Sequence, residues 1–124
     1  MAAHNELGAQ GEYEALLYLT KQGYTLLAHN WRVGHLELDI VAEQWGEVVF
    51  VEVKTRSSED FAPAAEAVTL YKKRNLIAAA RAYLARNGLL ERPYRYDIIT
   101  VVGKAQPFKL THLRNAYTLS LIHI

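Results

Sequence analysis

Three residues with the chemistry of a hydrolytic metal site lie close together in the sequence. Glu52 and Lys54 occupy alternate positions in the segment EVVFVEVK (47–54), whose nearly continuous hydrophobicity predicts a strand covered on both faces. Alternate residues of a strand leave the same face, so both charged side chains would enter the interior together. Burying them costs free energy unless they are paired or coordinate a metal. This strand is therefore the first candidate for a functional site.

The preceding segment, LELDIVA (36–42), supplies a further carboxylate. Its alternation predicts a strand with an apolar face and a carboxylate face: Leu38, Ile40 and Ala42 point one way, and Glu37, Asp39 and Val41 point the other. A hairpin centred on Gly46 would bring Asp39 within reach of Glu52 and Lys54. Two carboxylates could hold Mg²⁺, which would polarise a phosphate and activate a water molecule. The lysine could orient or deprotonate that water, or offset charge that develops on the phosphate.

A simpler interpretation competes with the metal site. Glu52 and Lys54 could form an ordinary salt-bridged strand pair, with Asp39 unrelated to them at an exposed strand end. Exposed pairs do not usually lie inside a run such as VVFVEV, where β-branched and aromatic residues flank them. The sequence context therefore favours the metal site.

The other elements must hold these two strands in place. The pattern predicts a mixed sheet flanked by helices, an α/β sandwich, because helices alternate with buried-type strands. The expected elements are a helix over Glu6–Gln22, a strand over Tyr24–Ala28, a turn over 29–35, a helix over Ala64–Asn87, a strand over Tyr96–Val102, and weaker strands at 107–113 and 117–124. No glycine-rich phosphate loop joins a strand to a helix, which excludes Rossmann and P-loop domains.

Length and composition exclude several other classes. A chain of 124 residues that is 51% hydrophobic predicts one folded domain over 1–124. The absence of cysteine excludes disulfides, cysteine-based zinc sites and a thiol nucleophile, and fits a reducing compartment. The acidic N-terminus is unlike a signal peptide, and no apolar run reaches the length of a membrane span. We therefore expect a soluble cytoplasmic protein with no membrane contact and no small-molecule cofactor.

The charges are divided unequally along the chain. Residues 1–66 hold 11 acids against 4 bases and residues 67–124 hold 2 acids against 10 bases, although the net charge is only +1. Such asymmetry suggests a surface that faces a polyanion in one part. A solvated helix face is the alternative for the bases that open the long helix. The predicted nucleic-acid contacts are Lys72, Lys73 and Arg74 on this helix, and Arg56. The five histidines show no metal-binding spacing, so we expect no zinc.

These motifs resemble those of a known family. The stretch ELDIVAEQWGEVVFVEVKTR (37–56) resembles the signature E-[IV]-D-L-[IV]-A…V-F-V-E-V-K-T-R of the YraN-like family of small, uncharacterised bacterial proteins. That family looks like part of the restriction-endonuclease-like, or PD-(D/E)xK, nuclease superfamily, and is similar to Holliday-junction resolvases. Further matches cover most of the chain: Gly11-Glu12 with Ala15, Asn30-Trp31-Arg32, Ala67-Val68 with Lys72, Tyr96-Asp97, and Asn115-Ala116-Tyr117. The chain departs from the pattern at Leu36 and at Ala62, where the family usually has glycine.

The resemblance implies a fold and a set of roles. The fold would be a restriction-endonuclease-like three-layer sandwich, a mixed sheet with an αβββαβ core. Asp39 and Glu52 would be metal ligands, and Lys54 would be the catalytic lysine. Glu12 would be an additional catalytic acid and metal ligand, which agrees with its place on the apolar face of the predicted first helix. In the alternative interpretation Glu12 caps the helix or pairs with Arg32 or Lys54.

Two functions follow as expectations. The first is a Mg²⁺- or Mn²⁺-dependent endonuclease that hydrolyses DNA phosphodiester bonds, on branched or damaged DNA. The second is a non-catalytic nucleic-acid-binding or assembly module of the same fold, which would use the basic helix or the terminal segment YTLSLIHI (117–124) as a contact. DNA is the expected partner, and a homodimer is compatible with either function.

Overall fold

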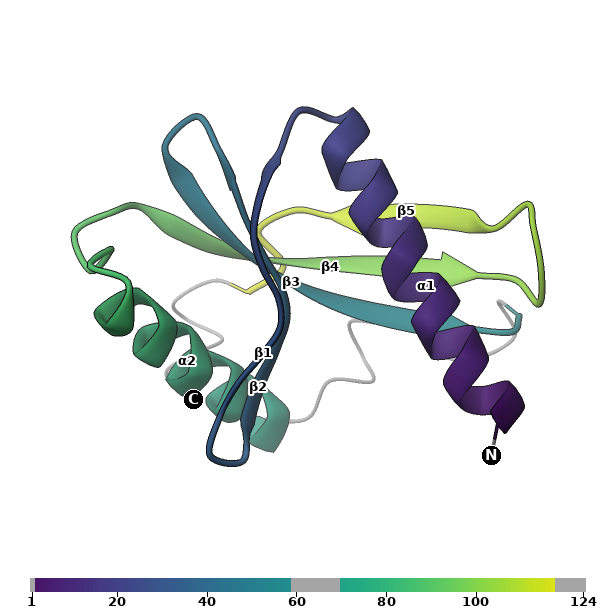
Figure 1. Cartoon of the computed structure of the whole chain (residues 1–124), viewed down its shortest axis with the longest axis horizontal. Coiled ribbons are helices and arrows are strands. Elements are labelled where there is room, and N and C mark those ends of the chain that lie inside the picture. Colours follow the sequence, from purple (N-terminus) through teal and green to yellow (C-terminus); the bar gives the residue numbers. More distant parts are fainter. Residues whose placement is uncertain (1, 59–69, 118–124) are drawn as a thin grey trace.

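The computed structural model describes residues 2–58 and 70–117 of the chain. In chain order its elements are α1 (Ala2–Lys21), β1 (Thr25–Val33), β2 (Leu36–Gln44), β3 (Glu47–Arg56), α2 (Leu70–Arg86), β4 (Tyr94–Val102) and β5 (Lys109–Leu113). Within these ranges the strands form one sheet in the order β1-β2-β3-β4-β5 (Figure 1). Only β3 and β4 run parallel, and the other neighbours are antiparallel. The predicted mixed sheet flanked by helices is confirmed.

Hydrophobic residues on both faces of the sheet make it the middle layer of a sandwich. One cluster joins α1 to one face and includes Ala15 and Leu19 of the helix with Val49 and Val51 of β3. The other cluster joins α2 to the opposite face and contains Val48 and Phe50, again from β3. Strand β3 is therefore buried on both faces, as its unbroken hydrophobicity predicts.

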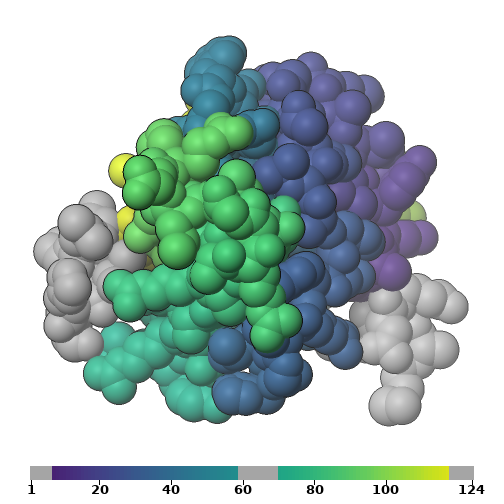
Figure 2. Space-filling model, turned by 60° about the vertical axis from the view of Figure 1, so that its left-hand side comes forward, coloured from purple at the N-terminus to yellow at the C-terminus, as the bar shows by residue number. Residues whose placement is uncertain are grey.

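The alternation along β3 decides which way its polar residues face. Glu52 and Lys54 continue the series of Val48 and Phe50, so they leave the sheet on the α2 side. Helix α2 packs against β2 and β1, and Figure 2 shows it in teal and green beside the blue β1–β2 hairpin. The functional residues of β3 thus share one side of the sheet with this helix and hairpin.

Two details of the β1–β2 hairpin differ from the prediction. The turn expected over 29–35 is wrong, because β1 continues to Val33 and only Gly34 and His35 form the turn. Strand β1 lies at the edge of the sheet and is largely exposed, so it tolerates the polar residues that made this segment resemble a turn. Its pairing with β2 includes a cross-strand ion pair between Arg32 and Glu37, 3.3 Å apart.

The expected direction of Leu38 is also wrong. Ile40 and Ala42 pack in the α1-side cluster, whereas Leu38 packs with Val41 in the α2-side cluster. Pairing between β2 and β3 begins only at Ile40, so β3 does not hold the first residues of β2 in the sheet. This end of the hairpin runs down beside the start of α2 in Figure 1. Because β2 is paired with β1 but not with β3 at Leu38, this end of the hairpin can twist and direct Leu38 toward α2.

The start of α1 also differs from the prediction, whereas the described span of α2 falls within its predicted range. Helix α1 begins at Ala2 instead of Glu6, and α2 spans Leu70–Arg86. The predicted helical residues 64–69, the Phe61-Ala62 position and the terminal segment 118–124 lie outside the described residues. Neither helix that the structure describes combines the length and the apolar character needed to cross a membrane.

A glycine sets the distance between α1 and β3. Gly11 is buried, and a Cβ atom placed on it would collide with the side chain of Thr55. The neighbouring residue, Glu12, is carried by the same turn of the helix. Close approach at Gly11 therefore brings Glu12 toward the end of β3.

We expect Gly11→Ala to destabilise the fold by about 1–3 kcal/mol, because the helix must move away from Thr55. Urea unfolding measures this change in the free energy of unfolding. Gly8→Ala is the matched control, since nothing lies within 4 Å of the added Cβ. The control should gain stability from the higher helix propensity of alanine. Equal stabilisation by both substitutions would contradict the close approach at Gly11.

Candidate functional site

The site forms where β2 and β3 separate. Their regular pairing ends at Ile40 and Val51. Just beyond this point, the backbone N–H of Val53 donates a hydrogen bond to Oδ2 of Asp39, with a donor–acceptor distance of 2.9 Å. The Asp39 side chain thus takes the place of the next backbone acceptor. It lies in the opening between the two strands.

Asp39 lines a cavity on each side of this opening. The larger cavity measures about 280 Å³ and is lined by His35, Leu36, Glu37, Asp39, Glu52, Lys72, Asn75, Leu76 and Tyr117. The smaller one measures about 210 Å³ and is lined by Leu7, Gly8, Glu12, Asp39, Val53 and Thr55. Asp39 lines both cavities, so its side chain is accessible from the α2 side and from the α1 side of the sheet.

On the α2 side, Glu52 and Lys54 form an ion pair. The Lys54 Nζ atom lies 3.1 Å from Oε1 of Glu52, and the two side chains are 15% and 23% exposed. Lys72, from the first turn of α2, reaches the same place. The charge of Lys54 and a hydrogen bond with it lower the pKa of Lys72, and burial lowers it further. Two lysines therefore meet beside the Glu52 carboxylate.

Negative charge gathers around Asp39. Burial raises the pKa of Asp39 to about 7, and the nearby carboxylate of Glu52 raises it as well. Glu12 and Glu37 act in the same direction, and the hydrogen bond from the Val53 N–H opposes them. The ionised form of Asp39 thus lacks sufficient compensation from the protein's own groups, which is the situation a bound cation would relieve.

Glu12 approaches from the α1 side. Its Oε1 atom lies 3.4 Å from Nε2 of His29, and this buried oxygen has no hydrogen-bond partner among the described residues. The two bases considered as partners from the sequence are engaged elsewhere, Arg32 with Glu37 and Lys54 with Glu52. The sequence did not identify His29, because its place opposite Glu12 depends on how α1 lies across β1.

These residues fit a cation that keeps part of its water shell. Within the described ranges, no three histidine, aspartate or glutamate side chains converge closely enough to enclose a metal ion. Mg²⁺ commonly binds through one or two carboxylates and retains several waters. Asp39 and Glu52 offer two such carboxylates. The buried Oε1 of Glu12 lies beside His29 but forms no hydrogen bond in the described part of the chain, so it can accept one from a metal-bound water.

The predicted basic contacts are placed unequally. Lys72 lines the larger cavity, whereas Lys73 lies over the ring of Tyr117, with Nζ 5.3 Å from the ring centre. Arg74 is exposed on α2 and does not line the cavity. Arg56 follows Lys54 on the same face of β3, and its Nε atom is buried without a hydrogen-bond partner in the described part of the chain. Of the four predicted contacts, Lys72 alone lines a cavity together with the carboxylates.

Tyr117 is a cavity residue to which the sequence assigned no chemistry. The sequence indicates it through the resemblance of Asn115-Ala116-Tyr117 to the family pattern and as the first residue of the terminal segment 117–124. Its position depends on the chain returning from β5 across the α2 side of the sheet, which no local pattern reveals. His35, in the turn between β1 and β2, also lines the cavity, and no sequence pattern predicts this position.

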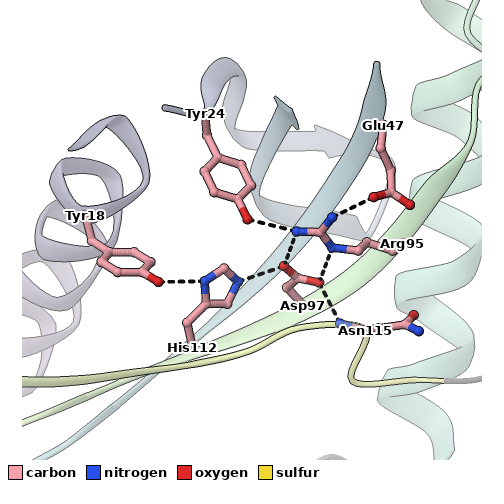
Figure 3. Close-up of polar contacts among 7 residues, drawn as sticks. All are labelled: Tyr18, Tyr24, Glu47, Arg95, Asp97, His112 and Asn115. Carbon is pink, nitrogen blue, oxygen red and sulfur yellow. Dashed lines mark hydrogen bonds and ion pairs between the residues drawn. The ribbon is translucent and has the colours of Figure 1, made fainter. Parts of the chain in front are cut away.

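A second polar cluster surrounds Asp97 of β4 (Figure 3). The buried Asp97 carboxylate accepts hydrogen bonds from Nε2 of His112, at 2.7 Å, and from Nε of Arg95, at 3.0 Å. The hydroxyl of Tyr18 in α1 lies 2.9 Å from Nδ1 of His112. We call this set the Asp97 network; it comprises Tyr18, Tyr24, Glu47, Arg95, Asp97, His112 and Asn115. It ties α1 to β4 and β5, and none of its members lines either cavity.

Comparison with known proteins finds one family. The model of the uncharacterised protein family UPF0102 matches residues 11–101, which include Glu12, Asp39, Glu52, Lys54 and Lys72. A UPF0102 protein of Bacteroides fragilis is 47% identical over 117 residues, which cover 94% of this chain and 96% of that protein. One of Bacteroides thetaiotaomicron is 48% identical over the same shares. One of Nitratidesulfovibrio vulgaris is 39% identical, over 95% of this chain and 88% of that protein.

Proposed function

This chain belongs to the uncharacterised protein family UPF0102, and from that premise we propose that it is a Mg²⁺- or Mn²⁺-dependent endonuclease that hydrolyses DNA phosphodiester bonds. The observation that carries the proposal is that Asp39 and Glu52 line the same cavity at the opening between β2 and β3, with Lys54 3.1 Å from the Glu52 carboxylate. The resemblance of the surrounding sequence to restriction-endonuclease-like nucleases supports the same chemistry. Its similarity to resolvases makes branched DNA the preferred substrate class.

Each residue has a definite role in this proposal. Asp39 and Glu52 would hold the cation, which, when bound, polarises the phosphate and favours ionisation of a bound water. Lys54, beside Glu52, orients the attacking water and offsets negative charge that develops on the phosphate. Glu12 accepts a hydrogen bond from water on the α1 side of Asp39 through Oε1, the oxygen that lies beside His29. The products are a phosphate monoester end and a hydroxyl end, since water adds to phosphorus and one ester oxygen leaves.

The basic residues of the second half support a polyanionic substrate. Lys72 lies at the cavity, and the same helix carries Lys73 and Arg74. Cations on this side of the protein would bind the DNA backbone with strong salt dependence and without sequence preference. Arg56, beyond Lys54 on β3, extends this set.

One observation favours a second candidate, a module that binds nucleic acid without cleaving it. No three acidic or histidine side chains in the described ranges enclose a metal site. Under this alternative, Lys72 and its neighbours would still bind the DNA backbone, and the carboxylates would have no catalytic task.

The experiment that tests the proposal is a cleavage assay on linear, nicked, single-stranded and four-way-junction DNA, with Mg²⁺, Mn²⁺ or a chelator. We expect Lys54→Ala to slow cleavage about 10²–10⁴-fold, because the water loses its orienting group and the phosphate loses a compensating charge. Lys104→Ala, at an exposed position outside both cavities, is the control and should cleave like the unmodified protein. Undiminished cleavage by Lys54→Ala would overturn the proposal. Salt-dependent DNA binding with no cleavage of any substrate would support the second candidate.

A further inference from the structure

Tyr117 lines the larger cavity and carries a hydroxyl that has no hydrogen-bond partner among the described residues. The residue is only 5% exposed and lines this cavity together with Asp39, Glu52 and Lys72. The hydroxyl oxygen is fully buried and has no hydrogen-bond partner among the described residues. Buried polar groups are normally hydrogen-bonded, and leaving one unpaired costs free energy. A ligand oxygen in the cavity would offset that cost.

The ring of Tyr117 is held firmly from several sides. The backbone N–H of Ala116 donates to the carbonyl oxygen of Tyr96, with a distance of 2.7 Å. The ring itself packs against the ring of Tyr96, with centres 6.2 Å apart, and under the Nζ atom of Lys73. The N–H of Asn115 donates to Asp97, which fixes the chain two residues earlier. The hydroxyl is therefore preorganised, and binding a ligand would cost little side-chain conformational entropy.

The chemistry of the cavity selects the kind of ligand. Burial and the charge of Glu52 raise the pKa of Tyr117 to about 12, so the hydroxyl keeps its proton at neutral pH and can donate it in a hydrogen bond. Lys72 and Asn75 add further donors along the same wall, and Asp39 and Glu52 are the acidic part of the cavity. A cation beside the carboxylates and donors beside α2 would together surround an anion of the phosphate type.

We propose that Tyr117 contacts the substrate, donating a hydrogen bond from its hydroxyl to a non-bridging oxygen of the phosphate held in this cavity. The assignment rests on the proposed function, because it takes the phosphate to be that of the DNA backbone. It makes Tyr117 a further catalytic residue, positioned by the α2-side core and by the chain that follows β5. The hydrogen bond fixes the phosphate next to Glu52 and Lys72.

The test compares Tyr117→Phe with the unmodified protein in a calorimetric titration with inorganic phosphate in the presence of Mg²⁺. We expect the substitution to weaken phosphate binding about tenfold or more, the loss typical of a hydrogen bond to a charged group. The melting temperature without phosphate should stay the same or rise, because the substitution removes a buried hydroxyl that has no partner. A purely structural hydroxyl predicts the opposite pair of results, unchanged binding and a lower melting temperature.

Tyr96→Phe is the matched control. Tyr96 is 4% exposed, contacts the Tyr117 ring and does not line the cavity, so its substitution should leave phosphate binding unchanged. Equal phosphate affinity in Tyr117→Phe and the unmodified protein, or no phosphate binding by the unmodified protein, would overturn the inference. Because this readout needs no cleavage, a failure of the nuclease proposal is recognised separately: phosphate binding would depend on Tyr117 while no DNA substrate is cut.

Discussion

Asp39→Asn is expected to slow DNA cleavage by about 10³-fold or more and, at the same time, to make the metal-free protein more stable. In the proposed function, loss of the carboxylate removes a ligand of the cation, whose action on the phosphate would be worth several kcal/mol, or about tenfold in rate for each 1.4 kcal/mol. The asparagine side chain can still accept the hydrogen bond that the Val53 N–H donates to Asp39. We therefore expect the backbone conformation around Asp39 and Val53 to stay the same in the variant.

The gain in stability follows from the direction in which the pKa of Asp39 is displaced. Burial and the charge of Glu52 raise this pKa from 3.8 to about 7 in the folded state. The unfolded carboxyl ionises above about pH 3.8, whereas the folded one keeps its proton until about pH 7, so the wild-type stability falls as pH rises between these values. Asparagine does not titrate. Its advantage should therefore be small near pH 4 and reach a few kcal/mol above pH 7.

Chemical unfolding in a chelator at pH 4 and pH 8 measures this change, and a cleavage assay measures the loss of rate. Adding Mg²⁺ should raise the melting temperature of the wild type and leave that of Asp39→Asn unchanged, because a ligand stabilises only the protein that binds it. Glu43→Gln, on the same strand but outside both cavities, is the control for activity. A variant that is less stable than wild type at pH 8 would contradict the account of the Asp39 carboxylate.

Asp97→Ala is expected to destabilise the fold by about 3–5 kcal/mol, the range for removing one partner from a buried charged cluster. Asp97 is completely buried and accepts hydrogen bonds from His112, Arg95 and the backbone N–H of Asn115. Its removal leaves the guanidinium of Arg95, only 15% exposed, with Glu47 as its remaining carboxylate partner. The connection from β4 through His112 to Tyr18 of α1 is broken as well.

The effect of this substitution should depend on pH in the acid range. Burial alone would raise the pKa of Asp97, but the hydrogen bonds from His112, Arg95 and the Asn115 N–H outweigh it and lower this pKa below 3.8. A carboxyl with a lowered pKa contributes stability that is present above pH 3.8 and is lost as pH falls through its folded-state value. The difference between wild type and Asp97→Ala should therefore narrow below about pH 4.

Urea unfolding at pH 7 and pH 3 measures both effects. Glu91→Ala is the control, because Glu91 is an exposed acid in the loop before β4 and its removal should change stability by less than about 0.5 kcal/mol. A loss below 1 kcal/mol for Asp97→Ala at pH 7 would show that the Asp97 network does not carry the docking of α1. The prediction concerns stability alone, since the network does not line the cavities.

Much of the fold is predictable from local patterns. The unbroken apolar run around Phe50 predicts a central strand, and β3 is buried on both faces. The alternation around Asp39 predicts a second strand, joined to the first by a hairpin at Gly46, and both are present. The alternation of side chains between the two faces of a strand follows from the backbone geometry of that strand. It can therefore be predicted without knowing which strands lie beside it.

Where the neighbours matter, local patterns are insufficient. Residues 29–33 are polar enough to suggest a turn, yet they form an edge strand because β2 supplies their hydrogen-bond partners. Leu38 has the parity of Ile40 but packs on the other side, since β2 is not paired with β3 at that point. The pairing of Glu12 with His29, of Arg95 with Glu47 and of Tyr18 with His112 joins residues from different elements of the chain.

For the candidate site, the sequence by itself determined the residue types and their spacing: Glu52 and Lys54 on one face of β3, Asp39 on the strand before it, and a basic helix after them. Only the tertiary structure decided that Asp39 stands in the opening between β2 and β3, that Glu12 and Lys72 approach it from opposite faces, and that Tyr117 completes the cavity. The physical reason is that side-chain direction within a strand follows from backbone geometry. The meeting of α1, α2 and the segment after β5 depends on how helices pack on the two faces of the sheet, and that is settled only by the whole core.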